Sequence, residues 1–200
     1  MKDVNGKVMA AIESALARGE VGMQVAAYVG EELVIDLWAG VADEQTGRKV
    51  DESTIFPVFS VTKAPAATAL HIQADRGLVD YDAPVAKYWP EFAANGKGTA
   101  TVRHALTHAV GIPMMPEGCT PEQMCDWDWM CRALAAMAPA WEPGTKHGYH
   151  AYTYGWLVGE VVRRTDPARR PFGQFVQDEI CQPLGITALW MGIPDEVEPR

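Results

Sequence analysis

The sequence lacks any long apolar run. Hydrophobic residues make up 48% of the 200 residues. Yet no stretch approaches the roughly 20 consecutive apolar residues that a membrane-spanning helix needs. Residues 1–23 mix charged residues with apolar ones at helical spacing, which differs from the continuous apolar core of a signal peptide. We therefore expect a cytoplasmic protein that does not associate with a membrane.

The sequence is also poor in positive charge. Its 17 lysines and arginines face 26 aspartates and glutamates, which gives a formal net charge of −9 at pH 7. The sequence has no basic stripe that could bind phosphate backbones or anionic lipid, so nucleic acid is not an expected partner. Charged residues make up 22% of the chain, which suits one soluble globular protein with a sizeable core.

The cysteines show no metal-binding pattern. They have neither Cys-x-x-Cys spacing nor a histidine at the distance typical of zinc sites, so reduced structural thiols are expected. His104 and His108 lie four residues apart, a spacing that can place two ligands on one helix face. Their segment has no nearby carboxylate ligand, so no metal site is predicted. The cysteines are Cys119, Cys125, Cys131 and Cys181.

The hydrophobic pattern predicts an α+β protein with few strands. Apolar residues at helical spacing indicate a first helix over residues 3–18. Two mostly apolar segments, 23–29 and 33–43, indicate a β-hairpin of a sheet that is covered on both faces. A polar turn follows, and residues 78–98 are expected to have little regular structure. Further helices are predicted over residues 61–77, 102–110, 121–137, 151–165 and 171–183.

No repeat, low-complexity tract or linker divides the sequence. We therefore expect a single unit over residues 1–200. Within this unit, residues 1–60 contain the first helix and the hairpin, and residues 61–200 form a mainly helical region.

One short stretch carries a chemical signal. Ser60 and Lys63 lie three residues apart where a predicted loop enters a helix, so the lysine amine can reach the serine oxygen. A serine hydroxyl is a poor nucleophile until a neighbouring group takes its proton. Partial burial and the helix dipole favour the neutral amine that a base requires, and free N–H groups at a helix start can stabilise an oxyanion. Alone, so short a pattern is a weak signal, because it also arises by chance.

The context of this pair resembles the serine β-lactamase and penicillin-recognising superfamily, in particular its class C-like branch with the family VIII carboxylesterases. The likeness begins in TIFPVFSVTKAPAATALHIQADRGLVDYDAPVAKYWPEF and continues through TVRHALTHAVGIP, WEPGTKHGYHAYTYGWLVGEVV and ICQPLGI, nearly the full chain. The resemblance implies a β-lactamase-like α/β sandwich, in which helices flank an antiparallel sheet, with a helical subdomain. It also implies that Ser60 is the nucleophile and Lys63 its base.

The resemblance further implies a Tyr-x-Asn motif in a loop beside the nucleophile. Tyr149, in GYHAYTYG, matches the tyrosine, and its phenol would return a proton to the leaving group. Ala151 stands where the asparagine would be; in the β-lactamase branch this asparagine helps to hold the substrate's amide. His150 is a candidate substrate-binding residue that would supply a replacement hydrogen bond, although a loop histidine is more often a solvated bystander.

A third motif of the family has no counterpart in the sequence. It reads Lys/His-x-Gly, or Trp-x-Gly in some esterases, and lies on an edge strand that supplies a second oxyanion donor. The triplet at residues 146–148 directly precedes Tyr149 in a loop and does not fit. We therefore expect residues 1–200 to be the N-terminal part of a longer enzyme. A C-terminal complement, as a second polypeptide or a continuation, would carry the third motif.

These features predict a serine hydrolase that cleaves a carboxylic ester through an acyl-enzyme, or an acyltransferase variant that passes the acyl group to another alcohol. The expected substrate is a small-molecule ester or acyl compound, and no metal or organic cofactor is required. A β-lactam or D-Ala-D-Ala peptide is an alternative substrate, which the missing asparagine and the absent signal peptide disfavour. A catalytically inert scaffold or fragment is the alternative from another class.

Overall fold

The structure is a computed structural model that describes residues 4–197 in two units. The described residues of the first unit are 4–57 and 194–197, and those of the second unit are 58–193. The boundary falls near residue 60, where the sequence indicates a change from the hairpin to the helical region. No feature of the sequence indicates that residues 194–197 group with the first unit.

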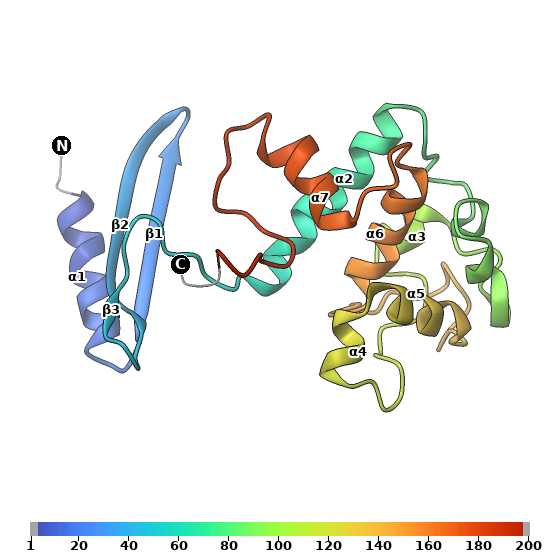
Figure 1. Ribbon diagram of the computed structural model, residues 1–200, viewed down its shortest axis with the longest axis horizontal. Coiled ribbons are helices and arrows are strands. Elements are labelled where there is room, and N and C mark those ends of the chain that lie inside the picture. Colours follow the sequence, from blue (N-terminus) through green and yellow to red (C-terminus); the bar gives the residue numbers. More distant parts are fainter. Residues whose placement is uncertain (1–3, 198–200) are drawn as a thin grey trace. The chain divides into compact units, whose positions relative to one another are not determined.

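The first unit is a helix followed by a three-stranded antiparallel sheet (Figure 1). Its elements are α1 (Val4–Leu16), β1 (Gly22–Val29), β2 (Glu32–Asp43) and β3 (Arg48–Lys49). The helix contacts β2 and buries Ile12. The expected hairpin is the pair of β1 and β2, joined by a turn in which Gly30 has a φ of 62°. The helix expected over residues 3–18 ends at Leu16, and its residue 3 lies outside the described residues.

The sheet has an exposed apolar edge. Within the described residues, β1 pairs with β2 alone, and Tyr28 and Val29 near its end are 65% and 70% exposed. Unpaired N–H and C=O groups on such an edge are a template for pairing with another strand. The strand β3 was not predicted, because its two polar residues lie opposite Val41 and Asp43 through backbone pairing and show no apolar pattern.

The second unit consists of short helices packed around α2, which contacts α6 and α7 (Figure 1). Its elements are η1 (Phe59–Thr62), α2 (Lys63–Asp75), η2 (Val85–Lys87), η3 (Pro90–Gly96), α3 (Val102–Leu106), α4 (Pro121–Cys125), α5 (Trp127–Ala136), α6 (Tyr154–Thr165), α7 (Phe172–Val176) and η4 (Gln177–Cys181). Its core contains the fully buried side chains of Leu70, Phe92, Met130, Leu134, Leu157 and Phe175. Of the helices that the structure describes, none has both the length and the apolar character needed to cross a bilayer.

Several predicted helices differ from the observed ones. The segment 121–137 forms two helices, because the Asp126 backbone is extended and its side chain accepts the N–H of Trp129 to begin α5. The segment 78–98, expected to be irregular, contains the 3₁₀ turns η2 and η3. The helix predicted over 171–183 is α7, which passes into the π-helical turn η4. The remaining three predictions were too long, since α2 runs only from Lys63 to Asp75, α3 ends at Leu106 and α6 begins at Tyr154.

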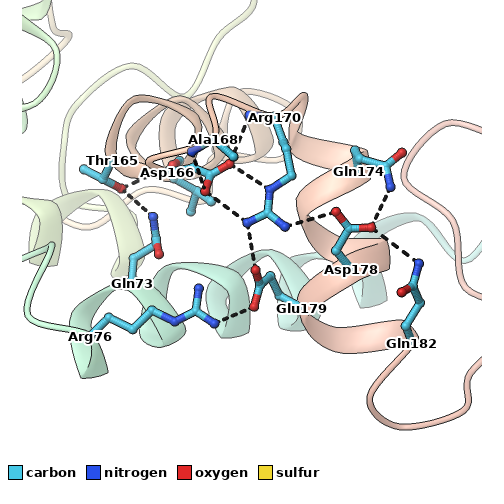
Figure 2. Close-up of polar contacts among 11 residues, drawn as sticks. Gln73, Arg76, Thr165, Asp166, Ala168, Arg170, Gln174, Asp178, Glu179 and Gln182 are labelled. Atoms are coloured by element: carbon cyan, nitrogen blue, oxygen red, sulfur yellow. Dashed lines mark hydrogen bonds and ion pairs between the residues drawn. The ribbon is translucent and has the colours of Figure 1, made fainter.

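A polar network around Arg170 joins the segment after α6 to η4 and to the end of α2 (Figure 2). The guanidinium donates to both oxygens of Asp166 at 2.9 and 3.0 Å, to Asp178 at 3.0 Å and to Glu179 at 2.7 Å. Glu179 also pairs with Arg76, the residue after α2. The hydrogen bonds from Arg170 lower the pKa of Asp166, whose side chain is almost fully buried. This network fixes the C-terminal end of the helix that begins at Lys63.

Replacing Arg170 with methionine should lower the free energy of unfolding by about 3 kcal/mol, because Asp166 is left as a buried carboxylate without its partner. The loss should shrink in acid. The native pKa of Asp166 is depressed, so the stabilisation is complete above the unfolded pKa of about 4 and disappears as pH falls through the native pKa. Urea unfolding over a pH series measures both effects. Arg169→Met is the matched control, since Arg169 is exposed. Equal stability of the two variants would contradict this role.

Candidate active site

Ser60 lies in a 3₁₀ turn that leads directly into a helix. The turn η1 ends at Thr62 and α2 begins at Lys63. The residue before the serine, Phe59, has a φ of 45°, a left-handed conformation that is uncommon for an aromatic residue. Strained backbone of this kind is found most often at functional sites. Ser60 is exposed, so the turn presents its hydroxyl at the surface of the second unit.

Three side chains that the sequence singled out come together at this turn. Lys63 Nζ donates a hydrogen bond to Ser60 Oγ at 3.1 Å. The Tyr149 hydroxyl, from the loop before α6, donates to the same oxygen at 2.6 Å. The expectation that both groups lie within hydrogen-bond reach of the serine is therefore met.

The Tyr149 phenol has an altered proton affinity. Its hydrogen bonds with Ser60 and then with Lys63 lower its pKa from the ordinary tyrosine value, burial opposes this change, and the positive charge of Lys63 adds to it. The amine of Lys63 also lies 4.9 Å from the centre of the Tyr149 ring. A phenol that ionises more readily is a better partner for proton transfer near neutral pH.

The lysine has a second hydrogen-bond partner that the sequence does not reveal. Lys63 Nζ donates to the backbone carbonyl of Ala151 at 2.7 Å. The resemblance draws attention to position 151 only because an asparagine side chain is missing there. The backbone supplies an oxygen to the amine at this position all the same. No sequence signal could have revealed it, because every residue carries a carbonyl.

The placement of His150 does not agree with the predicted contact to substrate. The residue is 1% exposed. Its Nε2 accepts the backbone N–H of Ile112 at 3.1 Å, so Nδ1 carries the proton and donates to the Gly148 carbonyl at 2.7 Å. Burial lowers the pKa of the ring, which favours this neutral form. Because both nitrogens bind backbone groups, His150 fixes the loop conformation and has no free group for a ligand.

The two histidines considered as metal ligands are engaged in separate contacts. His104 forms a capping box with Thr101, in which its Nδ1 accepts the Thr101 N–H at 3.3 Å. His108 Nδ1 accepts the N–H of His150 at 3.1 Å. Across residues 4–197, no three side chains of the ligand-forming types gather into a candidate metal site. All four cysteines are free thiols.

The arrangement around Ser60 can activate a hydroxyl. Its oxygen is hydrogen-bonded by an amine and by a phenol, and either group can accept its proton once in the basic form. Val58, Phe59 and Val61 beside it are 46%, 80% and 68% exposed, so the hydroxyl has apolar neighbours on the chain. Such a constellation can supply an activated serine oxygen as a nucleophile.

Known proteins resemble this chain in both sequence and fold. The beta-lactamase family profile matches residues 8–200. The esterase/beta-lactamase LipL of Mycobacterium tuberculosis is 38% identical over 178 residues, which are 89% of this chain and 41% of that protein. A solved family VIII carboxylesterase matches at a TM-score of 0.89 and 39% identity, over 98% of this chain and 53% of the other.

A solved penicillin-binding protein homologue from Caulobacter crescentus matches at a TM-score of 0.83 and 39% identity, over 95% of this chain and 52% of the other. The chain thus spans about half the length of the relatives it matches. Its mixed α+β architecture, with helices and an antiparallel sheet, corresponds to part of the β-lactamase fold.

Proposed function

Because this chain belongs to the beta-lactamase family, we propose that it carries the nucleophile of a serine hydrolase that cleaves carboxylic esters through an acyl-enzyme. The observation that supports this proposal most strongly is the pair of hydrogen bonds that Lys63 and Tyr149 donate to Ser60 Oγ. Relatives that are named as esterases and as beta-lactamases support the broader class.

The proposed reaction has two halves. In the first, the Ser60 oxygen bonds to the ester carbonyl carbon while Lys63 takes the hydroxyl proton. The tetrahedral intermediate then loses the alkoxy group, to which Tyr149 gives a proton. In the second half, water adds to the acyl carbon and gives a proton to the ionised Tyr149. Lys63 returns its proton to the Ser60 oxygen as the carboxylic acid leaves, which restores the serine hydroxyl. An alcohol in place of water would make the reaction an acyl transfer.

Position 151 favours an ester over a β-lactam. Ala151 has no side-chain group to bind a substrate's amide, and its carbonyl already accepts a hydrogen bond from Lys63. His150 is buried with both ring nitrogens occupied. The amide of such a substrate would thus lack a hydrogen-bond partner at this position, and the loss of one hydrogen bond weakens binding by about 1 kcal/mol. A β-lactam or a D-Ala-D-Ala peptide is the second candidate substrate, because several relatives are named as beta-lactamases.

Comparison of p-nitrophenyl butyrate with nitrocefin tests the substrate class. We expect kcat/KM for the ester to exceed that for the β-lactam by about fivefold or more, the effect of one missing hydrogen bond of about 1 kcal/mol. Ala151→Asn should narrow this difference by restoring an amide-binding side chain. Faster turnover of nitrocefin by the unaltered protein would contradict the proposed class.

We further propose that polypeptide beyond residues 1–200 completes the enzyme. It would pair with the edge of β1 that no other strand within residues 4–197 covers, shield exposed residues such as Tyr28, and supply the third motif with its oxyanion donor. Hydrogen exchange should then be slow at the outward N–H groups of β1 in the natural protein. Acylation by residues 1–200 alone should be about a hundredfold slower, as expected when one oxyanion donor is missing. Full esterase activity of residues 1–200 alone would contradict this proposal.

A further inference from the structure

One residue outside the three predicted catalytic groups binds the loop before α6 that carries Tyr149, here called the tyrosine loop, on both sides of that tyrosine. His108 lies in the turn after α3, with a φ of 60°. Its backbone carbonyl accepts the N–H of Gly148 at 3.1 Å. Its ring Nδ1 accepts the N–H of His150 at 3.1 Å. The residues that flank Tyr149 on either side are therefore both bound to His108.

The His108 ring also packs against Tyr149 itself. The centres of the His108 and Tyr149 rings lie 4.9 Å apart, with 56° between their planes. On α6, the Tyr154 ring lies at the same 4.9 Å from His108 and is only 4% exposed, so it gives the histidine a firm support. The ring contact and the two backbone hydrogen bonds together limit the positions open to the Tyr149 side chain.

The hydrogen bond to His150 requires an unprotonated Nδ1 on His108. Burial, and then electrostatic interactions with His150, His147 and Lys63, lower the pKa of His108 to about 4. The ring is therefore neutral above that pH, with its proton on Nε2. The side chains that face it come from the tyrosine loop, from α6 and from α2, and they are His147, Tyr149, His150, Tyr154 and Lys63.

We propose that His108 is a positioning residue that directs the Tyr149 hydroxyl onto Ser60 through the hydrogen bond its ring accepts from the His150 N–H. This inference rests on the proposed function, because the position of Tyr149 matters only if its phenol moves the serine proton. His108 binds the residues on either side of Tyr149, acts only through that loop and is not a catalytic residue. Its role is to fix the loop so that the 2.6 Å contact between Tyr149 and Ser60 persists.

Two substitutions separate the hydrogen bond from the backbone conformation. In His108→Asn, Oδ1 is bonded to Cγ just as Nδ1 is in histidine, so the acceptor is retained, and asparagine tolerates a left-handed φ. In His108→Gly, the backbone conformation is equally accessible but the acceptor is lost. The ring contact with Tyr149 is absent from both variants. A difference between them therefore reports on the hydrogen bond.

The natural protein carrying each substitution is compared by two measurements. One is the titration of the Tyr149 phenol, followed by phenolate absorbance against a matched Tyr149→Phe background. The other is the rate at which a fluorophosphonate labels Ser60. His108→Asn should keep both close to the parent values. His108→Gly should raise the Tyr149 pKa towards its ordinary value and slow labelling by about a hundredfold, the effect of a displacement of roughly 1 Å.

Equal values for two folded variants, whether both match the parent or both are impaired, would overturn the positioning role of this hydrogen bond. If His108→Gly does not fold, as judged by circular dichroism, the asparagine variant decides alone, since its impairment would also overturn the proposal. If the parent protein is not labelled at all, the proposed function fails, while the phenol titration still tests the placement of Tyr149.

Discussion

Ser60→Ala should reduce ester turnover by at least about a thousandfold and abolish labelling by a fluorophosphonate, because removing the nucleophile of a serine hydrolase leaves only the contributions of substrate binding and oxyanion stabilisation. The fold should remain intact. Ser60 is exposed, and its oxygen accepts hydrogen bonds from Lys63 and Tyr149. When the serine oxygen is removed, both side chains can bind water in its place. Steady-state kinetics and thermal unfolding measure the two effects.

The matched control for this change is Ser14→Ala. Ser14 is an exposed serine on α1, in the unit that does not contain the candidate site. Its replacement should leave turnover and labelling unchanged and alter stability by less than about 0.5 kcal/mol. Turnover by Ser60→Ala at nearly the parent rate would remove Ser60 from the mechanism. Absence of labelling in the parent would instead favour an inert scaffold.

Lys63→Ala, Tyr149→Phe and the double variant should lose similar amounts of activity, each by about a hundredfold to ten-thousandfold, the usual contribution of a positioned acid or base. The reason is that both side chains bind the same oxygen and serve one sequence of proton transfers. Groups that act as a unit lose most of their effect when either is removed. Measurement of kcat/KM for the three variants in a double-mutant cycle tests this coupling.

Two changes in the same loop serve as controls for this cycle. Tyr152→Phe removes a hydroxyl from a tyrosine that is 59% exposed, and Lys146→Ala removes an exposed amine. Neither should alter kcat/KM appreciably. Losses for Lys63 and Tyr149 that simply multiply in the double variant would show that the two side chains act independently.

The pH dependence of the rate tests the role of Tyr149 as a general acid. A general acid is active only while protonated, so the rate should fall as pH rises through the Tyr149 pKa, which lies below the ordinary tyrosine value of about 10. The profile of Tyr149→Phe should lack this alkaline limb. An unchanged limb in the variant would assign it to another group.

Local patterns in the sequence predicted much of the secondary structure and one contact of the candidate site. The hairpin of β1 and β2 follows from two apolar segments around Gly30, and the Ser60–Lys63 contact follows from helical spacing. Tyr149 lies far from both in the sequence, so the resemblance to a family, and not the residue pattern, brought it to the site. The split of segment 121–137 depended on the conformation of Asp126, which an otherwise helical pattern conceals.

Contacts between distant residues were beyond the reach of the sequence. His108 appeared there only as a weak metal candidate, because nothing in the pattern places its ring nitrogen on the His150 N–H. His150 appeared as a free loop side chain, although the fold buries it and binds it to Ile112. In both cases the role of the histidine depends on the conformation of the loop near Tyr149. That conformation is set by hydrogen bonds between residues about forty positions apart in the sequence.

The proposed covalent acyl-enzyme on Ser60 can be detected by mass spectrometry of a quenched reaction. The natural protein is mixed with p-nitrophenyl butyrate, stopped in acid during turnover and digested with a protease. We expect a butyryl group on the peptide that contains Ser60, and no such group in Ser60→Ala. Turnover that proceeds with the acyl group on another residue, or with none on Ser60, would contradict this proposal.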